Sequence, residues 1–506
     1  MLRGALLRMT DPISSAEPRV FAPRNAWRFV TENLAAVVLL SVILVIPCFW
    51  HQRIQAGDLG SHMYNAWLAE LVERHEISGV DVVWQWTNVL FDLLVANAAK
   101  ILGFVAAERI VASASVALFF WSTFALIASF SGRPPWGLTP FLLILAYGYA
   151  FHMGFLNYYL SLGLAFLALA AVWQKGTGNW LIGVAIGLLA IVAHPIGFAF
   201  CYGAALYAWL SEKLCGFWRV SLSVLGLLIL LCVRWFFKLQ SEFDADWTNK
   251  RQAFDILGTD QMKVFGHNYT LLAGVALVWV VVICLGALYN WAIRGEKPLA
   301  RLVLAVDLYL LSIVAIKALP ENVRFGTSGA WAGLLGSRLT LISAVFGLLL
   351  LACLKLPPWH VRGTIVIATI FLALLYHDTG GLDRMEENAR ALVTELPPGT
   401  RIVAVAKAPT DWRVPFVYHS IERACIGRCF SYGNYEPSSS QFRVRTAPGT
   451  SLVVNSDFKA QAIARGDYTV QPGDLPLVSI FQCDAADWTR LCATELRIGS
   501  KTGKPN

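Results

Sequence analysis

Charged residues are scarce in this chain. Asp, Glu, Lys and Arg make up only 15% of its 506 residues, whereas apolar residues make up 57%. Soluble globular proteins typically carry about 25% charged residues and about 45–50% apolar residues. This deficit, together with a mean hydropathy of +0.56, excludes an ordinary soluble protein and predicts a chain that crosses a membrane several times.

Several short motifs that mark enzyme classes are also missing. The chain contains no phosphate-binding loop of the Walker type, no dinucleotide-binding Gly-x-Gly-x-x-Gly, no His-Glu-x-x-His and no Gly-x-Ser-x-Gly. ATP hydrolysis, nicotinamide chemistry and ordinary serine hydrolysis therefore lack support. The net charge of +8 requires no nucleic acid, because cytoplasmic loops of membrane proteins are rich in Lys and Arg.

Long apolar runs define most of the chain. Each is long enough, or nearly so, to cross a hydrocarbon layer of about 30 Å. The runs occupy 33–50, 107–130, 137–152, 156–173, 179–194, 196–212, 218–237, 269–293, 299–317, 337–354 and 361–376. We therefore predict an α-helical polytopic membrane protein with about eleven transmembrane helices.

The distribution of Lys and Arg predicts the orientation. Segment 84–104 is only moderately apolar, and we interpret it as lying along the outer face. The short loops that contain Lys or Arg then share one side with the Arg-rich tail 1–32, while the opposite loops 151–156 and 194–197 contain neither residue. The positive-inside rule then predicts a cytoplasmic N-terminus in the inner membrane and a first outer loop at 51–106.

A change in hydropathy after Tyr376 predicts a second domain. Residues 378–506 have the composition of a small soluble α/β domain, with a helix-like stretch from 383 to 396 and strand-like segments at 401–406, 451–455 and 476–481. We predict three parts: the cytoplasmic tail 1–32, a transmembrane module 33–377 and an extracytoplasmic domain 378–506.

Four of the ten cysteines lie in this domain. An even number of cysteines outside the cytoplasm favours two disulfides. The alternative is a zinc site, which the spacings Cys-x3-Cys and Cys-x8-Cys fit poorly. The four residues are Cys425, Cys429, Cys483 and Cys492. The other six lie in or beside apolar runs, and we interpret them as packing residues.

Polar residues that are unusual beside a membrane span gather on the predicted outer side. They are Asp58, His62, His152, Asn157, His194 and Arg338. Asp58 and His62 are four residues apart and would share one face of a helix. A guanidinium at the outer end of a span, such as Arg338, suits a lipid phosphate. Each residue also has a structural alternative: a helix cap, a tight turn or a side chain that reaches lipid headgroups.

Two charges, Arg234 and Asp307, lie inside apolar runs, where each needs a partner or water. They are the basis of a second hypothesis, a transporter or lipid flippase. That hypothesis predicts inverted repeats and broken helices, which the hydropathy does not show. A third hypothesis is a non-catalytic envelope assembly or sensor protein whose outer domain is the working part.

The arrangement resembles the GT-C superfamily of integral-membrane glycosyltransferases. The segment 57–71, Gly-Asp-Leu-Gly-Ser-His-Met-Tyr-Asn-Ala-Trp-Leu-Ala-Glu-Leu, lies where that family carries its catalytic Asp, and the run 86–94 looks like its outer-face helices. The resemblance covers residues 30 to 376 as architecture. It implies that a sugar is transferred from a polyprenyl-phosphate or diphosphate donor to an extracytoplasmic glycan, lipid or protein acceptor.

The resemblance also implies roles for the outer residues. Asp58, with His62 beside it, would act as general base on the acceptor hydroxyl, and the displacement would invert the anomeric centre. The leaving lipid phosphate would be bound by a second group of residues. These are Arg338, His194, His152 and Asn157. Many members carry paired acidic residues tied to a divalent metal, whereas Asp58 has no acidic neighbour in the sequence, so we assign no cofactor and disfavour a metal.

Overall fold

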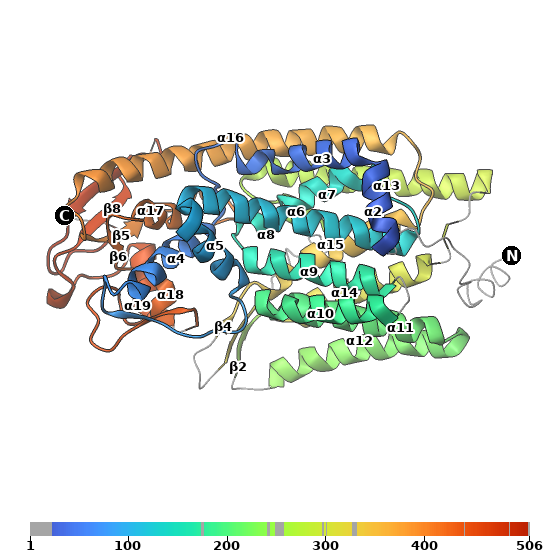
Figure 1. The fold of residues 1–506 in the computed structure, drawn as a ribbon, viewed down its shortest axis with the longest axis horizontal. Helices are drawn as coiled ribbons and strands as arrows, with labels where there is room; N and C mark the ends of the chain where they lie inside the picture. The colour runs from blue at the N-terminus through green and yellow to red at the C-terminus, as the bar shows by residue number, and fades with distance from the viewer. Residues whose placement is uncertain are drawn as a thin grey trace.

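Long helices that lie side by side form most of the molecule, and a smaller part with short strands covers one end of them (Figure 1). The structure is a computed structural model and is 67% helical. It describes residues 23–173, 177–239, 243–247, 258–295, 298–299, 301–325, 331–439, 441–484 and 486–503.

Six of the described helices are long and apolar enough to cross a membrane. They are α6 (Phe104–Ser131), α9 (Leu156–Trp173), α12 (Gly216–Leu239), α13 (His267–Arg294), α15 (Leu335–Ala352) and α16 (His360–Glu395). Other helices pack against them: α3 (Leu34–Val45) on α6, α10 (Thr177–Ala193) and α11 (Pro195–Lys213) on α9, and α14 (Leu302–Ala318) on α15. A short amphipathic helix, α2 (Pro23–Glu32), precedes α3.

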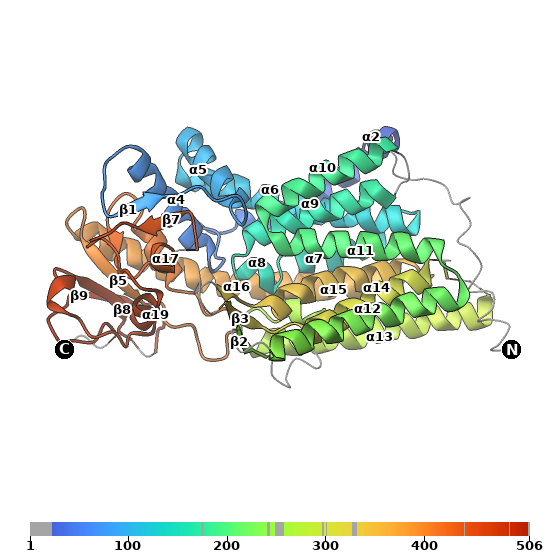
Figure 2. The same cartoon turned by 90° about the horizontal axis from the view of Figure 1, so that it is seen from below.

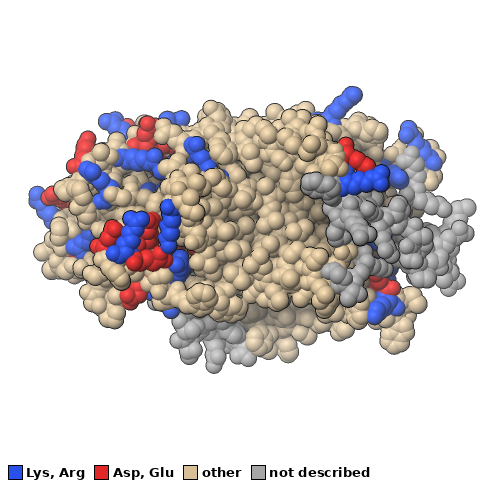
Figure 3. Space-filling model, viewed as in Figure 1, with Lys and Arg blue, Asp and Glu red and all other residues tan. Residues whose placement is uncertain are grey.

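A broad band around the middle of the bundle carries no visible charge, and the charged side chains gather towards its two ends (Figure 3). Large apolar side chains cover the outer faces of α12 and α13. For example, Val278 is 63% exposed and Leu285 is 59% exposed. Such a surface is unfavourable in water and suited to lipid. The prediction of a helical membrane protein is thus confirmed, with six helices of spanning length among the described residues.

The predicted run 137–152 is not a single helix. Helix α7 (Thr139–Ala146) ends, and the short α8 (Tyr149–His152) begins after Gly148. A Cβ on Gly148 would lie 2.8 Å from the carbonyl oxygen of Gln261, and the Gln261 side chain accepts a hydrogen bond from the backbone N–H of Ala150 at 3.1 Å. Tertiary contact with the η5 turn (Thr259–Met262) therefore holds the break, which hydropathy alone does not reveal.

Helix α5 (Leu90–Leu102) occupies most of segment 84–104. Its 13 residues span about 20 Å, which is too short for a hydrocarbon layer of about 30 Å. Gly103, with φ of 78°, then turns the chain into α6. The segment predicted to be the first outer loop also contains α4 (Leu59–Glu73) and β1 (Val80–Val82).

Helix α16 runs without interruption through the boundary predicted at 377/378 (Figure 1). The helix-like stretch predicted at 383–396 is its final part, not a separate element. The fall in hydropathy marks where the helix stops being apolar, and its Glu, Arg, Ala and Leu residues still favour helix. One continuous helix therefore connects the bundle with the C-terminal domain.

The C-terminal domain contains a four-stranded sheet in the order β6-β5-β8-β9. Strand β5 (Arg401–Val405) pairs in parallel with β6 (Phe430–Ser431) and β8 (Val478–Gln482), and β9 (Leu491–Glu495) pairs antiparallel with β8. The helices α17 (His419–Ala424), α18 (Tyr435–Ser439) and α19 (Asp457–Arg465) surround the sheet. The strands predicted at 401–406 and 476–481 are therefore observed, with slightly different ends.

The strand predicted at 451–455 is wrong. The strand nearby is β7 (Val444–Thr446), and it pairs antiparallel with β1 of the first outer loop (Figure 2). A second small sheet, in the order β2-β3-β4, joins two further loops of the bundle. Its strands are β2 (Phe243–Asp246), β3 (Asn322–Phe325) and β4 (Trp331–Ala332).

The two predicted disulfides, Cys425–Cys429 and Cys483–Cys492, are present. The zinc alternative is therefore wrong for these four residues. The six free cysteines do not all pack inside the protein, because Cys215 and Cys232 are exposed on the bundle.

A buried arginine fastens the C-terminal domain to the bundle. Arg423 of α17 is only 3% exposed. Its guanidinium pairs with Glu386 of α16, donates to Glu108 of α6 at 3.2 Å, and donates to the backbone carbonyl of Ile54 at 2.9 Å. Three separate parts of the chain therefore meet at one charged side chain.

The two charges inside apolar runs do not pair with each other. Asp307 lies 3.8 Å from Arg219. Arg234 donates to the backbone carbonyl of Lys317, and its guanidinium lies 4.5 Å from the ring centroid of Trp247. Each charge therefore has a local partner.

Candidate functional site

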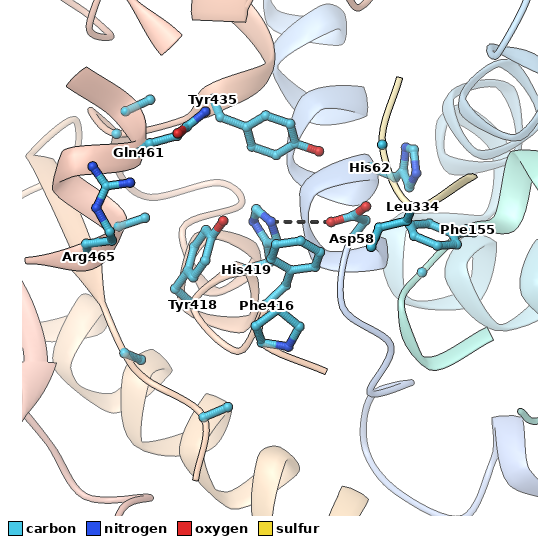
Figure 4. A pocket seen from close by; sticks show the side chains of 18 of the residues that line it. Asp58, His62, Phe155, Leu334, Phe416, Tyr418, His419, Tyr435, Gln461 and Arg465 are labelled. Atoms are coloured by element: carbon cyan, nitrogen blue, oxygen red, sulfur yellow. Dashed lines mark ion pairs between the residues drawn. The ribbon is translucent and has the colours of Figure 1, made fainter. Parts of the chain in front are cut away.

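A cavity of about 670 Å³ lies between the helical bundle and the C-terminal domain. Residues from both parts line it, and Figure 4 shows several of their side chains converging. Five of the six outer residues selected from the sequence are among them: Asp58, His62, Asn157, His194 and Arg338. The residues on the domain side include Phe416, Tyr418, His419, Tyr435 and Gln461.

The backbone around Asp58 is held by the turn between α8 and α9. The N–H groups of Gly57 and Asp58 donate to the carbonyl oxygens of His152 and Met153 at 2.8 and 3.0 Å. Gly154 has φ of 82°, and a Cβ there would lie 2.4 Å from the Asp58 nitrogen. Only glycine allows this close approach, which fixes Asp58 at the N-terminus of α4.

His152 is not among the described residues that line the cavity. Its ring is 3% exposed, lies against Phe265, and places Nδ1 3.1 Å from the carbonyl oxygen of Gln55. The phosphate-binding role predicted from the sequence has no support in this position. His152 instead helps to hold the loop that leads to Asp58.

His62 forms a pair with Asp92 of α5. Its Nδ1 lies 2.7 Å from Asp92 Oδ1, and Asp92 Oδ2 accepts a hydrogen bond from Asn157 at 2.8 Å. The side-chain oxygen of Asn157 in turn accepts from the N–H of Phe91 at 2.7 Å. Asn157 therefore anchors the start of α5 and orients Asp92, which in turn orients His62.

The charges of this pair stabilise each other. Burial disfavours the imidazolium, but the Asp92 carboxylate outweighs burial and raises the pKa of His62 to about 9. Burial likewise works against the charged form of Asp92, yet His62 and Asn157 hold the pKa of that carboxyl below its ordinary value. At neutral pH the pair is an imidazolium and a carboxylate.

His419 of α17 approaches Asp58 from the opposite wall of the cavity (Figure 4). Its Nε2 lies 3.5 Å from Asp58 Oδ1, and its Nδ1 lies 2.5 Å from Glu422 Oε2. Burial raises the pKa of Asp58, although His419 and His62 oppose that shift. Burial disfavours the charged form of His419, but Glu422 outweighs it and raises the pKa of the imidazole.

The helices α4 and α17 can approach so closely because Gly60 has no side chain. A Cβ there would lie 2.4 Å from the carbonyl oxygen of His419. One residue along α4, the Ser61 hydroxyl donates to Glu436 of α18 at 2.8 Å. Burial raises the pKa of Glu436 to about 7.

Arg338 presents a cation to the cavity. No described carboxylate lies within ion-pair distance of it, and its guanidinium stacks on Phe155 at 4.2 Å. Its NH1 lies 3.0 Å from Nε2 of His194. His194 caps the N-terminus of α11 with Nδ1, which accepts from the N–H of Ile196 at 3.2 Å.

Arginine can only donate, so Nε2 of His194 is the acceptor in the contact with Arg338. A neutral imidazole has one acceptor nitrogen, so this contact and the capping bond from Ile196 compete for the ring. The donors on this part of the cavity wall therefore belong to Arg338. Its guanidinium is a candidate site for a phosphate or carboxylate.

No group of three or more His, Cys, Asp or Glu side chains in the described ranges is arranged to hold a metal ion. Comparison of the chain with family models, with curated proteins and with solved structures gives no match. The chemistry of the site must therefore be argued from its own geometry.

No pattern in the sequence indicates a functional role for Asp92, His419 or Glu422. Asp92 belongs to a segment whose path was ambiguous, and nothing local indicates that it meets His62. His419 and Glu422 lie three residues apart, a spacing that brings side chains together on a helix. That spacing indicates only that His419 and Glu422 contact each other. It does not indicate that His419 contacts Asp58.

Proposed function

We propose that the protein is a membrane glycosyltransferase of the GT-C type, which transfers a sugar from a polyprenyl-phosphate donor to an extracytoplasmic acceptor with inversion. The observation that carries the proposal is that Asp58 and Arg338 line one cavity. A displacement at the anomeric carbon needs a base for the attacking hydroxyl and a cation for the departing phosphate. These two side chains are suited to those tasks.

The reaction is a single displacement. The acceptor hydroxyl donates its hydrogen bond to the Asp58 carboxylate, and its proton moves to that carboxylate as the oxygen attacks the anomeric carbon. The bond from that carbon to the phosphate oxygen breaks, and its electron pair stays on the phosphate. Arg338, held beside His194, offsets the developing negative charge. The attack from the opposite face inverts the anomeric centre.

The proposal includes about eleven spans with the cavity on the extracytoplasmic side. Two arginines at the far end of α6 from the cavity support this orientation, because positive charge favours the cytoplasmic face. Arg133 donates to the carbonyls of Ala352 and Leu354, and Arg301 donates to those of Ser129 and Phe130. The disulfides of the C-terminal domain also favour an oxidising compartment on the cavity side.

No metal takes part in the proposed reaction. Asp92 is a further acidic residue of the same loop, but both of its oxygens are engaged, one by His62 and the other by Asn157. The proposed partners are a polyprenyl-phosphate-linked sugar, the membrane lipid around it, and a glycan, lipid or protein acceptor.

The transporter alternative has weaker support. Arg234 and Asp307 have separate local partners, Lys317 and Arg219 respectively, so they do not outline a shared ion pathway. The non-catalytic alternative predicts that the site residues are dispensable. Mutation of these residues therefore distinguishes it from our proposal.

The test compares the glycans of a strain that lacks the gene and carries wild-type protein, Asp58→Asn or Asp81→Asn. Asp81 lies in the same outer loop and is exposed, which makes it a matched control. We expect wild type and Asp81→Asn to restore the missing glycan, and Asp58→Asn to leave it missing. Full restoration by Asp58→Asn at equal protein levels would refute the proposed role.

A further inference from the structure

His419 and Glu422 bring the C-terminal domain into direct contact with the candidate base. His419 is completely buried, and Glu422 is 2% exposed. Hydrogen bonds join Ser431, Glu422 and His419: the Ser431 hydroxyl donates to Glu422 Oε1 at 2.8 Å, and Glu422 Oε2 lies against Nδ1. Nε2 has no hydrogen-bond partner among the described residues and faces Asp58 Oδ1 at 3.5 Å. We propose that Asp58 and His419 share one proton, and that Glu422 fixes where that proton lies.

The positions of the hydrogens follow from the donors and acceptors. An ionised Glu422 can only accept, so Nδ1 of His419 carries a proton. Nε2 then faces Asp58 Oδ1 at 3.5 Å. If His419 were neutral and Asp58 ionised, two acceptors would face each other in a buried position, which is unfavourable. One proton between Nε2 and Oδ1 removes this conflict.

Other charged and titratable groups face the pair from each neighbouring element. His62 of α4 and Arg338 of α15 are positive, whereas Glu422 of α17 and Glu436 of α18 are acidic. The phenol rings of Tyr418 and Tyr435 complete the wall, with ring centroids 4.2 and 5.5 Å from that of His419. The cations favour ionised Asp58, and the two glutamates favour the imidazolium, so the shared proton lies mainly on His419.

This inference rests on the proposed function for its chemical meaning. His419 engages one carboxylate oxygen of Asp58, which leaves the other oxygen to receive the proton of the acceptor hydroxyl. His419 and Glu422 are then positioning residues that act through Asp58. The C-terminal domain thereby completes the base, in addition to forming one wall of the cavity.

The proton can be located without any substrate. The full-length protein in lipid nanodiscs is labelled with ¹⁵N-histidine, and the nine imidazoles are followed through a pH titration. His419→Gln assigns the resonance of His419. If that variant does not fold, contacts of the imidazole with the Tyr418 and Tyr435 rings assign it in the wild type.

We expect the His419 imidazole to remain protonated well above pH 6.5, the ordinary pKa of histidine. Asp58→Asn and Glu422→Gln should each lower its titration midpoint by about one pH unit or more, because each removes a neighbouring carboxylate. The matched control Asp81→Asn should leave the midpoint unchanged. A midpoint that is the same in wild type and Asp58→Asn would overturn the shared proton.

The titration and the glycan assay give independent answers. Loss of the glycan in Asp58→Asn, together with an unchanged His419 midpoint, would leave the glycosyltransferase standing and remove the proton-sharing pair. A shifted midpoint together with full glycan synthesis by Asp58→Asn would keep the pair and refute the proposed function.

Discussion

Arg338 and His194 lie side by side on the cavity wall, with NH1 3.0 Å from Nε2. They come from the starts of two helices that are far apart in the sequence, α15 and α11. Arginine can only donate, so NH1 donates to the imidazole and the other guanidinium N–H groups remain for a ligand in the cavity. This arrangement favours a bound anion and underlies the phosphate role proposed for the pair.

Arg338→Gln should therefore reduce glycan synthesis strongly. Loss of one donor to a developing negative charge costs about 10²–10³-fold in rate. Arg338→Lys should retain part of the activity, because it keeps the charge but not the planar set of donors. The exposed Arg497 provides the control, Arg497→Gln, which should behave as wild type. Equal activity of wild type and Arg338→Gln would contradict a phosphate role.

The His62–Asp92 pair predicts a pH-dependent stability. The pKa of His62 is raised to about 9, so its contribution is complete below about pH 6.5 and is lost as the pH rises through 9. The lowered pKa of Asp92 makes its contribution complete above about pH 4 and lost at more acidic pH. The pair is therefore most stabilising between these limits.

Asp92→Asn should lower the melting temperature in nanodiscs most at pH 6 and least near pH 10. The raised pKa of His62 corresponds to about 3 kcal/mol at pH 6. Asp81→Asn is the control and should not change the melting temperature at either pH. A variant whose loss of stability is the same at both pH values would show that the charges of the pair do not stabilise the fold.

Ionisation of Glu436 should destabilise the fold, whereas ionisation of an ordinary paired carboxylate stabilises it. Burial raises its pKa to about 7, so its contribution to stability is complete below about pH 4.5 and is lost as the pH rises through 7. Glu436→Gln keeps an acceptor for the Ser61 hydroxyl and removes the buried charge. We expect a higher melting temperature than wild type at pH 8 and little difference at pH 4.5. A lower melting temperature at pH 8 would contradict the assignment.

Arg423 should be essential for the docking of the C-terminal domain. Arg423→Met leaves Glu386 and Glu108 buried without their shared partner, and removal of one member of a buried charge network costs about 3–5 kcal/mol. We expect rapid proteolysis of the C-terminal domain in this variant. Glu386 and Glu108 then keep Arg390 and Arg53 as ion-pair partners, and a second substitution, Glu386→Gln, should partly restore protease resistance by removing one of the two buried carboxylates. Unchanged resistance in Arg423→Met would show that the domain is fastened elsewhere.

Much of the site could be predicted because its bundle residues share a local property. His194 and Arg338 each stand at the end of an apolar run, and Asp58 lies in the loop after the first run, on the same predicted side of the membrane. Helices that cross a bilayer bring their ends to one of two faces. The possible positions of residues near these ends are therefore restricted. Their meeting in one cavity follows from topology without knowledge of the packing.

The domain side of the site could not be predicted in this way. The contact of His419 with Asp58 depends on how α17 packs on α4, which requires Gly60 and the buried Arg423. These are long-range contacts between the C-terminal domain and the loop that contains α4. No periodicity in either segment indicates them. Hydropathy also does not reveal that α16 continues past Tyr376 as a polar helix.

The most direct measurement of the central claim is sugar transfer by wild type, Asp58→Asn and Asp58→Glu, measured as glycan recovered in a strain that lacks the gene. Asp58→Asn keeps the size of the side chain and removes its basicity, so we expect no recovery above the empty strain. Asp58→Glu keeps the carboxylate but displaces it, and we expect partial recovery. Wild-type glycan levels in Asp58→Asn, at equal amounts of folded protein, would contradict the account.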